Sequence, residues 1–369
     1  MSTAIFPEAV FAAPANPLNF AAQPAVSVII PCYNEEKFIG KALENLVDQY
    51  ASEAYEIVVV DGMSTDRTRE VVEDFQRSHP RVAIKLLQNP ARAIPHALNR
   101  GIAAARGEII ARMDAHAAPS PGYIRGCVQA LRAGEAAVVG MPCRVRAAAD
   151  TATARAIAIS VSHPFGIGDA KYRLGNDVGS IVGADPRVRP GSAPEDVDTV
   201  AFACFRKSLW LELGGFDERL LTNEDYDFNY RVRARGERVV LDRAAHCDYF
   251  ARPTLGKLAF QYFRYGTWKA RMIRHRPCST KLRQLVAPAF VVSIALLACV
   301  GFWRAGFWTL LALELAVYLV AAFGFSITAG RKNHEDLRVM LTMPAAFLAI
   351  HLSWGTSFLW GLITPKGQR

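Results

Sequence analysis

The chain has 369 residues, of which 51% are hydrophobic and 21% charged, and it carries a formal net charge of +9. Its length accommodates one α/β domain of about 250 residues and a smaller part, and its apolar content is high for a purely soluble protein. The seven cysteines are scattered without a Cys-x-x-Cys pair, which argues against a disulfide scaffold and a structural zinc site.

The first 25 residues contain four prolines and no lysine or arginine. They lack the basic segment and the continuous apolar core of a signal peptide, so we expect a loose amino-terminal tail over 1–25. From residue 26 onward, β-branched runs alternate with helical patterns. Strands are predicted at 26–31, 56–60, 83–87, 108–113, 136–145, 200–206 and 239–241.

Helices are predicted between these strands, after Asn34 and Ser64 and at 95–105, 121–133, 207–213 and 224–235. The alternation predicts an α/β fold with a mostly parallel, Rossmann-like sheet and flanking helices over 26–250. The stretch 147–198 is rich in glycine, proline and aspartate. We expect it to form loops and short helices that cover the site.

The end of the chain contains three apolar runs with almost no charge, at 285–303, 306–327 and 339–363. Each is near or above the roughly 20 residues that cross a hydrocarbon core. The third run contains Pro344 and His351 and is the weakest candidate, so we expect a membrane domain of two to three helices over 285–369. With three spans, the carboxyl terminus would lie across the membrane from the enzyme domain.

A basic stretch precedes the first apolar run. Nine lysines and arginines fall between Arg252 and Arg283, and no acidic residue occurs from Tyr249 to Leu313. Nucleic acid would bind such a patch, but its position beside a membrane span favours anionic lipid headgroups on the cytoplasmic face. We therefore expect interfacial helices over 251–284 and no nucleic-acid partner.

Acidic residues follow several predicted strands, and ligands of open α/β sheets bind at that edge. Asp61 follows the second strand, where it could accept a hydrogen bond from a nucleotide base or form the turn with Gly62. Glu35, in the first turn, could hold ribose hydroxyls or interact with the helix dipole. These positions indicate a nucleotide site.

A candidate metal pair follows the fourth strand. Asp114 and His116 point the same way in an extended segment, so both could ligate one ion. A carboxylate with an imidazole suits manganese better than magnesium. His246, after the last strand, could complete this set or contact phosphate. The alternatives are an Asx turn at Asp114 and ordinary structural histidines.

Glu224 and Asp225 open a predicted helix, where N-terminal capping would explain them. Asp227 is a third acid in the same turn, which exceeds what capping needs, so one carboxylate could be a general base. In the basic stretch, three residues could bind phosphate and stack a sugar, or belong to an amphipathic interfacial helix: Gln261, Arg264 and Tyr265.

Together these segments resemble the family 2 glycosyltransferases of the GT-A fold, from about Val26 to Arg283. The resemblance implies that Asp225 is the catalytic base beside Glu224 and that Asp114 begins the metal motif. It also implies nucleotide contacts from Pro31, Tyr33, Glu35, Asp61, Arg92 and Asn99, and acceptor or diphosphate contacts from Gln261, Arg264 and Tyr265. The chain departs from the family pattern at His116, where a second metal Asp is usual, and at Tyr265, where polysaccharide synthases have Trp.

More narrowly, the motifs are similar to those of bacterial membrane-bound glucosyltransferases that act on lipid-linked oligosaccharide. This implies an inverting, β-linkage-forming enzyme that moves a hexose, with glucose as the expected sugar, from a UDP-sugar to a polyprenyl-diphosphate-linked acceptor. The implied cofactor is a divalent cation, manganese or magnesium. The implied location is the bacterial inner membrane, multi-pass, with the catalytic domain in the cytoplasm and other exopolysaccharide assembly enzymes as candidate partners. The alternatives are a processive polysaccharide synthase and a non-catalytic nucleotide-sugar-binding scaffold.

Overall fold

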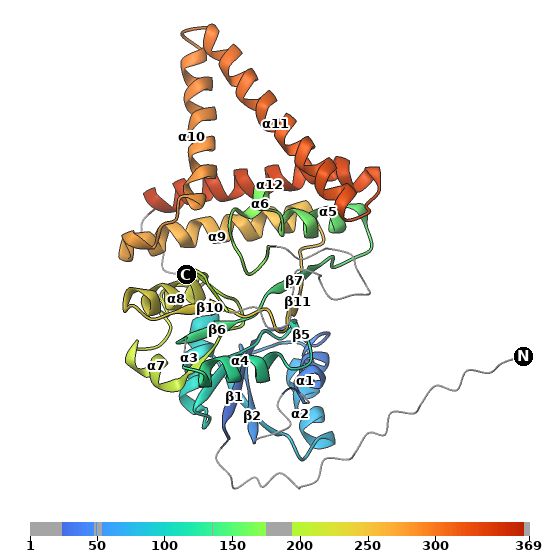
Figure 1. The fold of residues 1–369 in the computed structure, drawn as a ribbon, viewed down its shortest axis with the longest axis vertical. Coiled ribbons are helices and arrows are strands. Elements are labelled where there is room, and N and C mark those ends of the chain that lie inside the picture. The colour runs from blue at the N-terminus through green and yellow to red at the C-terminus, as the bar shows by residue number, and fades with distance from the viewer. Residues whose placement is uncertain (1–23, 48, 50–53, 135, 175–193, 365–369) are drawn as a thin grey trace, which may run out of the picture.

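The computed structural model describes residues 24–47, 49, 54–134, 136–174 and 194–364. The expected tail over 1–25 therefore lies almost wholly outside the described residues. An eight-stranded mixed sheet forms the centre of the first part (Figure 1). Its strands lie in the order β3 (Ala83–Gln88), β2 (Tyr55–Asp61), β1 (Val26–Cys32), β4 (Ile109–Arg112), β9 (Cys204–Arg206), β6 (Val138–Gly140), β10 (Val239–Leu241) and β8 (Glu195–Asp196).

The first four strands of this order are parallel to one another, as the alternation of strands and helices predicts. Antiparallel β9 joins β4 to β6, and antiparallel β8 closes the far edge. The fold class predicted from the sequence is thus confirmed in its main features, with the sheet mixed rather than parallel throughout.

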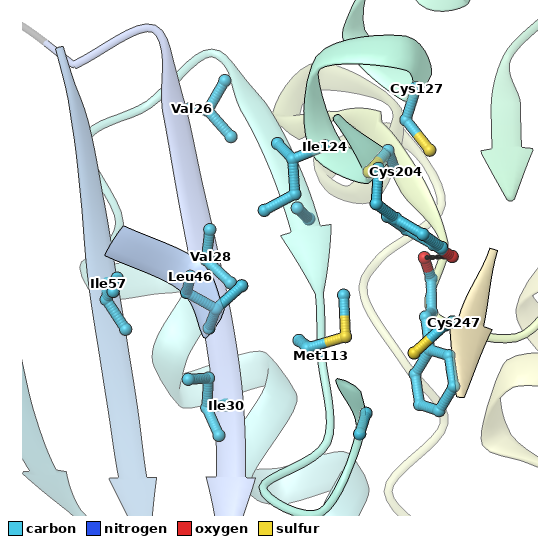
Figure 2. Packing of buried hydrophobic residues seen from close by; sticks show 14 of the residues in the cluster. Val26, Val28, Ile30, Leu46, Ile57, Met113, Ile124, Cys127, Cys204 and Cys247 are labelled. Carbon is cyan, nitrogen blue, oxygen red and sulfur yellow. Dashed lines mark hydrogen bonds between the residues drawn. The ribbon is translucent and has the colours of Figure 1, made fainter. Parts of the chain in front are cut away.

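Helices cover both faces of the sheet because its strands are apolar on both sides. One cluster contains residues of α1 (Ile39–Val47), α2 (Thr68–Ser78) and α4 (Tyr123–Arg132). The opposite cluster contains residues of α3 (Ile94–Ala104), α7 (Lys207–Glu212) and α8 (Glu224–Ala234). Along β1, Val28 and Ile30 join the first cluster and Ile29 the second, as the two-residue period of a strand requires. Figure 2 shows Val28, Ile30 and Ile57 in the first cluster.

The predicted strand over 136–145 is wrong as a single element. The chain forms β6, turns at Met141 and Pro142, and continues as β7 (Cys143–Arg146) in another sheet. Pro142 has no N–H to donate to a ladder, and its carbonyl oxygen instead accepts from the backbone N–H of Cys247 at 2.9 Å. The second sheet has the order β5 (Ala118–Pro119), β11 (Cys247–Phe250) and β7, and the sequence patterns predicted neither β5 nor β11.

The remaining helices form the carboxyl-terminal part, together with two helices from the stretch 147–198. They are α5 (Ala152–Ser160), α6 (Pro164–Ile167), α9 (Leu255–His275), α10 (Arg283–Gly301), α11 (Gly306–Lys332) and α12 (Leu337–Ile363). Loops and short helices were expected in 147–198, but α5 is also part of an apolar cluster with α9 and α12. Figure 1 shows α9 and α12 lying side by side, with α10 and α11 projecting away from the sheet.

Three helices of the described chain are long and apolar enough to cross a membrane, namely α10, α11 and α12. They coincide with the three apolar runs of the sequence. A carboxyl-terminal membrane region is therefore supported by length and composition.

Candidate active site

A cavity of about 1050 Å³ separates the carboxyl edge of the sheet from the apolar helices. Its polar end is lined by residues that end or follow β4 and by residues that open α8: Arg112, Asp114, His116, Glu224 and Asp225. Its apolar end is lined by α6 and by the membrane-candidate helices, including Phe165, Phe290, Tyr318, Ile350 and Trp354. One continuous cavity thus joins an acidic site to an apolar wall.

Arg112, at the end of β4, anchors the polar end of the cavity. Its guanidinium lies 3.0 Å from Glu224 Oε1 and 3.5 Å from Asp114 Oδ1, and its side chain is 10% exposed. Burial raises the pKa of Glu224 to about 7, while Arg112 opposes this rise. Three carboxylates, those of Asp114, Glu224 and Asp225, therefore surround one arginine, and this excess of negative charge suits a bound cation.

The three acids at the start of α8 have different surroundings. Asp227 is 1% exposed and bonds Arg231 at 2.7 Å and Arg276 at 3.3 Å. Glu224 and Asp225 both line the cavity, but Glu224 pairs with Arg112, whereas Asp225 has no ion-pair partner among the residues that the structure describes. Asp225 Oδ1 accepts the backbone N–H of Tyr226 at 2.7 Å. Asp225 is therefore the carboxylate best placed to accept a proton from a bound hydroxyl.

Asp114 and His116 both line the cavity, but not on the extended segment that their spacing predicts. The chain turns here, and the backbone N–H of Ala117 donates to the carbonyl oxygen of Asp114 at 3.0 Å. His116 Nδ1 lies 3.1 Å from Glu35 Oε1. Because a carboxylate only accepts, Nδ1–H donates and Nε2 keeps its lone pair for a ligand. This hydrogen bond raises the pKa of His116 against the effect of burial. A carboxylate behind a ligating histidine is a common support for metal sites.

His246 does not join this pair. It is absent from the cavity lining, its Nε2 lies 3.8 Å from Asp248, and burial lowers its pKa. Within the described ranges, no group of three histidine, cysteine, aspartate or glutamate residues could hold a metal ion. The fit of the protein to a cation therefore rests on Asp114 and His116, with further ligands required from substrate or water.

The predicted nucleotide residues divide into two groups. Pro31, Tyr33, Glu35 and Asp61 lie at the carboxyl ends of β1 and β2 or in the turn after β1. Tyr33 is 47% exposed, and a Cβ at Gly62 would lie 3.3 Å from the Cβ of Tyr33. Asp61 is fully buried, and its carboxylate accepts the backbone N–H of Ser64 at 3.2 Å. This hydrogen bond is the turn role that the sequence left open.

None of the six nucleotide candidates belongs to the lining of the large cavity, and the remaining two, Arg92 and Asn99, follow β3. Arg92 is exposed at a positive φ of 55°. Asn99 lines a second hollow of about 540 Å³. Its amide nitrogen donates to the Phe216 carbonyl oxygen and to the Glu218 carboxylate, at 2.9 and 3.0 Å. Its amide oxygen accepts from the Phe216 N–H and from the indole N–H of Trp210, at 2.8 and 3.1 Å. The geometry of Asn99 favours a structural role over a nucleotide contact.

The three residues of α9 that are predicted to contact the acceptor all line the cavity: Gln261, Arg264 and Tyr265. Gln261 Nε2 donates to the hydroxyls of Tyr249 and Tyr265 at 2.9 Å. Arg264 donates to Thr222 Oγ1 at 3.0 Å. This network holds polar side chains at the border between the acidic and apolar ends of the cavity.

Arg173 is a cavity residue that sequence reasoning missed. Its guanidinium lies 5.3 Å from the ring centroid of Tyr172 and 4.9 Å from that of Tyr249. Its Nε is buried without a hydrogen-bond partner, and no carboxylate pairs with it in the part of the chain that the structure describes. No motif marks Arg173, since only the folded loop brings it beside α9.

Both parts of the chain match glycosyltransferase families. Residues 27–184 match the model of glycosyl transferase family 2, and residues 199–367 match that of glycosyl transferase family 21. The succinoglycan biosynthesis protein ExoA of Rhizobium meliloti (strain 1021) is 27% identical over 90% of this chain and 93% of its own length.

Two further proteins are similar. The dolichyl N-acetyl-alpha-D-glucosaminyl phosphate 3-beta-D-2,3-diacetamido-2,3-dideoxy-beta-D-glucuronosyltransferase of Methanococcus voltae is 28% identical over 68% of this chain and 74% of its own. The solved structure of mannosyltransferase PcManGT from Pyrobaculum calidifontis, in complex with GDP-Man and Mn2+, covers 92% of this chain and 88% of that chain, with a TM-score of 0.58 and 22% identity. At this identity the likeness concerns the fold.

The fold is similar to that of a glycosyltransferase with the GT-A fold, and each of two glycosyltransferase family models matches just under half of the chain. More narrowly, the chain is similar to ExoA over most of its length, and it ends in three helices that are long and apolar enough to cross a membrane.

Proposed function

We propose that this enzyme transfers a hexose, with glucose as the expected sugar, from a UDP-sugar to a polyprenyl-diphosphate-linked oligosaccharide in bacterial exopolysaccharide synthesis. One observation carries the proposal: the cavity of about 1050 Å³ joins the acidic sheet edge to the apolar helices. A lipid-linked sugar has both a hydroxyl for the acidic end and a hydrocarbon chain for the apolar wall. Similarity to ExoA supports the exopolysaccharide setting.

Asp225 is the proposed general base. Its carboxylate takes the proton of the attacking acceptor hydroxyl while that oxygen bonds to the anomeric carbon of the donor. The bond from that carbon to the diphosphate breaks on the opposite side, so the configuration inverts and a β-linkage forms. Glu224 remains paired with Arg112, which compensates the negative charge of its carboxylate.

Asp114 and the free Nε2 of His116 would hold the divalent cation, with manganese or magnesium as candidates. When bound, the cation offsets the negative charge of the departing diphosphate. Glu35 orients His116 through the Nδ1 hydrogen bond, in addition to its predicted contact with the ribose.

The donor nucleotide would lie against the ends of β1 and β2. Tyr33 offers an exposed ring for the base, beside a turn that needs glycine at position 62 because a Cβ there would crowd the Cys32 carbonyl oxygen at 3.2 Å. Pro31, Asp61 and Arg92 complete the proposed contacts. Because PcManGT binds GDP-Man, the choice of UDP over GDP has to be tested directly.

Arg173 and Arg264 would bind the diphosphate of the acceptor lipid, with Gln261 and Tyr265 placing the first sugar. Both arginines line the cavity without a carboxylate partner among the described residues. A diphosphate would supply the missing negative charge in a partly dehydrated site, where charge-assisted hydrogen bonds are strong.

The catalytic domain is proposed to face the cytoplasm of a bacterial inner membrane. Arg331, Lys332 and Arg338 flank the connection between α11 and α12, whereas the turn between α10 and α11 carries only Arg304. Basic residues accumulate on the cytoplasmic side of membrane proteins, which supports this orientation.

The test is nucleotide release by the detergent-purified full chain from a panel of UDP- and GDP-sugars, with manganese or magnesium, and with or without bacterial lipid extract. We expect metal-dependent UDP release that lipid stimulates and that is strongest with UDP-glucose. Stimulation with a GDP-sugar alone would overturn the donor assignment. Products that carry one added sugar per lipid, rather than a series of longer polymers on a gel, would distinguish this function from that of a processive synthase. Binding of the donor without release of its nucleotide would favour a non-catalytic scaffold.

A further inference from the structure

The helix α12 has the composition of a membrane span, but its surroundings differ from those of α10 and α11. At 27 residues it is about 40 Å long, enough to cross a hydrocarbon core of about 30 Å. Figure 1 shows it lying along α9, whereas α10 and α11 extend away from that layer. Whether α12 can cross the membrane therefore depends on whether α9, beside it, can enter the hydrocarbon core.

Two glycines hold α12 against α9 at close distance. A Cβ at Gly266 of α9 would lie 2.6 Å from the carbonyl oxygen of Trp354 in α12. A Cβ at Gly361 of α12 would lie 2.8 Å from the Cβ of Ala270 in α9. Since 266 faces 354 and 270 faces 361, the two helices run in the same direction in contact over successive turns.

Both ends of α12 are tied to helices outside the membrane-candidate set. At its start, the Asp336 carboxylate accepts from Arg155 of α5 at 2.7 Å. At its end, Arg274 of α9 donates to the carbonyl oxygens of Gly361 and Thr364 at 2.8 Å. A helix that spanned the bilayer would have its ends on opposite sides, and one of these two ties would then lie across the membrane.

A third tie lies at the middle of α12. His351 Nε2 lies 2.8 Å from the carbonyl oxygen of Phe165 in α6. Because a carbonyl oxygen only accepts, Nε2–H donates and Nδ1 accepts from the hydroxyl of Tyr318 at 2.9 Å. The start, middle and end of α12 thus all contact the layer formed by α5, α6 and α9.

The helix α9 cannot follow α12 through hydrocarbon. It carries five lysines and arginines along its 21 residues, and charged side chains are costly at the centre of a bilayer: Lys257, Arg264, Lys269, Arg271 and Arg274. It also contributes Gln261 and Arg264 to the cavity. Since α12 is parallel to α9 and in contact with it, both helices must lie at the membrane surface.

We infer that α12 is an interfacial helix whose exposed apolar stripe rests on the lipid, and that only the hairpin of α10 and α11 crosses the bilayer. The stripe contains Leu341, Leu352, Trp360 and Ile363, and all but the half-buried Leu352 are exposed. Its partner is the acyl–headgroup boundary of the leaflet on the catalytic side. The end of α12 then lies on the same side as the catalytic domain.

This placement has a consequence for the cavity. Ile350, His351 and Trp354 of α12 belong to its apolar lining, and Gln261 of α9 to its polar border. With α9 and α12 at the surface, the border lies at headgroup depth. A lipid-linked molecule can then present its polar head to the sheet without leaving the leaflet, whichever sugar is transferred.

The first test locates three epitope tags on the full chain in sealed membrane vesicles of both orientations. The tags precede residue 1, interrupt the 302–305 turn and follow residue 369. We expect protease to remove both terminal tags from the same side and the turn tag from the opposite side. The inference is overturned if the two terminal tags lie on opposite sides, or if the turn tag lies with them.

The second test measures depth along α12. Leu341, Leu352 and Ile363 are each 11 residues apart, about three turns, and so share one face. Each is replaced singly by cysteine in a background with Cys278→Ser and Cys299→Ser, since the other five cysteines are buried, and labelled with a fluorophore. We expect equal quenching by a shallow lipid quencher at all three sites. Deep quenching at 352 alone would refute the inference. Leu313→Cys, an exposed position of α11 nearer the 302–305 turn than Tyr318, is the deep control.

Discussion

Replacement of Asp225 by asparagine tests the proposed base with little change in shape. Asparagine keeps an oxygen that can accept the Tyr226 N–H, which lies 2.7 Å from Asp225 Oδ1. Because Asp225 has no ion-pair partner among the described residues, the change leaves no cation uncompensated. The fold should therefore survive, and the lost property is the capacity to take a proton.

The expected magnitude follows from this role. General base catalysis contributes roughly 10²- to 10⁴-fold in rate, which is about 3 to 5 kcal/mol of activation free energy. We expect kcat of Asp225→Asn to fall within this range while the Kd of the UDP-sugar changes less than about threefold. Asp196→Asn, which alters an exposed carboxylate bonded to Arg238, is the matched control and should retain activity.

The assay is UDP release with lipid acceptor by purified variants whose melting temperatures are compared with that of the wild type. A folded Asp225→Asn protein that keeps more than about a third of the wild-type kcat would refute the assignment. A large loss of donor binding in the same variant would also contradict it, because a base that acts on the acceptor should not be needed to hold the nucleotide.

Four further changes test other contacts. Arg173→Gln should raise the KM for lipid acceptor about tenfold or more without changing that for donor, whereas Arg271→Gln, whose guanidinium lies over Trp268 at 4.5 Å, should leave both unchanged. Asp227→Asn should lower the free energy of unfolding by about 3 kcal/mol, because it weakens two ion pairs of a buried carboxylate; an unchanged melting temperature would contradict this. Gly266→Ala should cost about 1–3 kcal/mol of stability through contact with α12, measured by thermal unfolding in detergent. Burial lowers the pKa of Lys269 to about 7. Between pH 7 and 10 the unfolded chain therefore binds a proton that the folded chain does not, so the contribution of Lys269 to stability rises with pH. The melting temperature of Lys269→Met should rise less from pH 7 to 9 than that of the wild type, and equal slopes would disprove the effect.

Much of the α/β part could be predicted because its elements have local signals. The apolar run over 26–31 and the helical pattern after Asn34 correspond to β1 and α1. Prediction failed where position in space decides the element. The run over 136–145 is apolar throughout, but Pro142 divides it between two sheets, and the pairing of β7 with β11 joins residues about a hundred positions apart.

The candidate site shows the same division. The sequence alone determined that carboxylates gather at the carboxyl ends of strands, because parallel strands place those ends at one edge, and it marked Asp114, His116 and the acids that open α8. The family resemblance had already pointed to Asp225, but only the tertiary structure gave the physical reason, since Arg231 and Arg276 pair with Asp227 and not with Asp225. It also removed His246 from the metal pair and brought Arg173 into the cavity.

The membrane region makes the physical reason plain. Composition determined that α10, α11 and α12 are apolar helices long enough to cross a bilayer, because hydropathy and length are properties of each segment by itself. The position of α12 depends instead on Gly266, Gly361 and Arg274, which bind it to a basic helix distant in sequence. Such contacts form only in the folded chain, so the sequence determined the kind of helix and the tertiary structure decided its place.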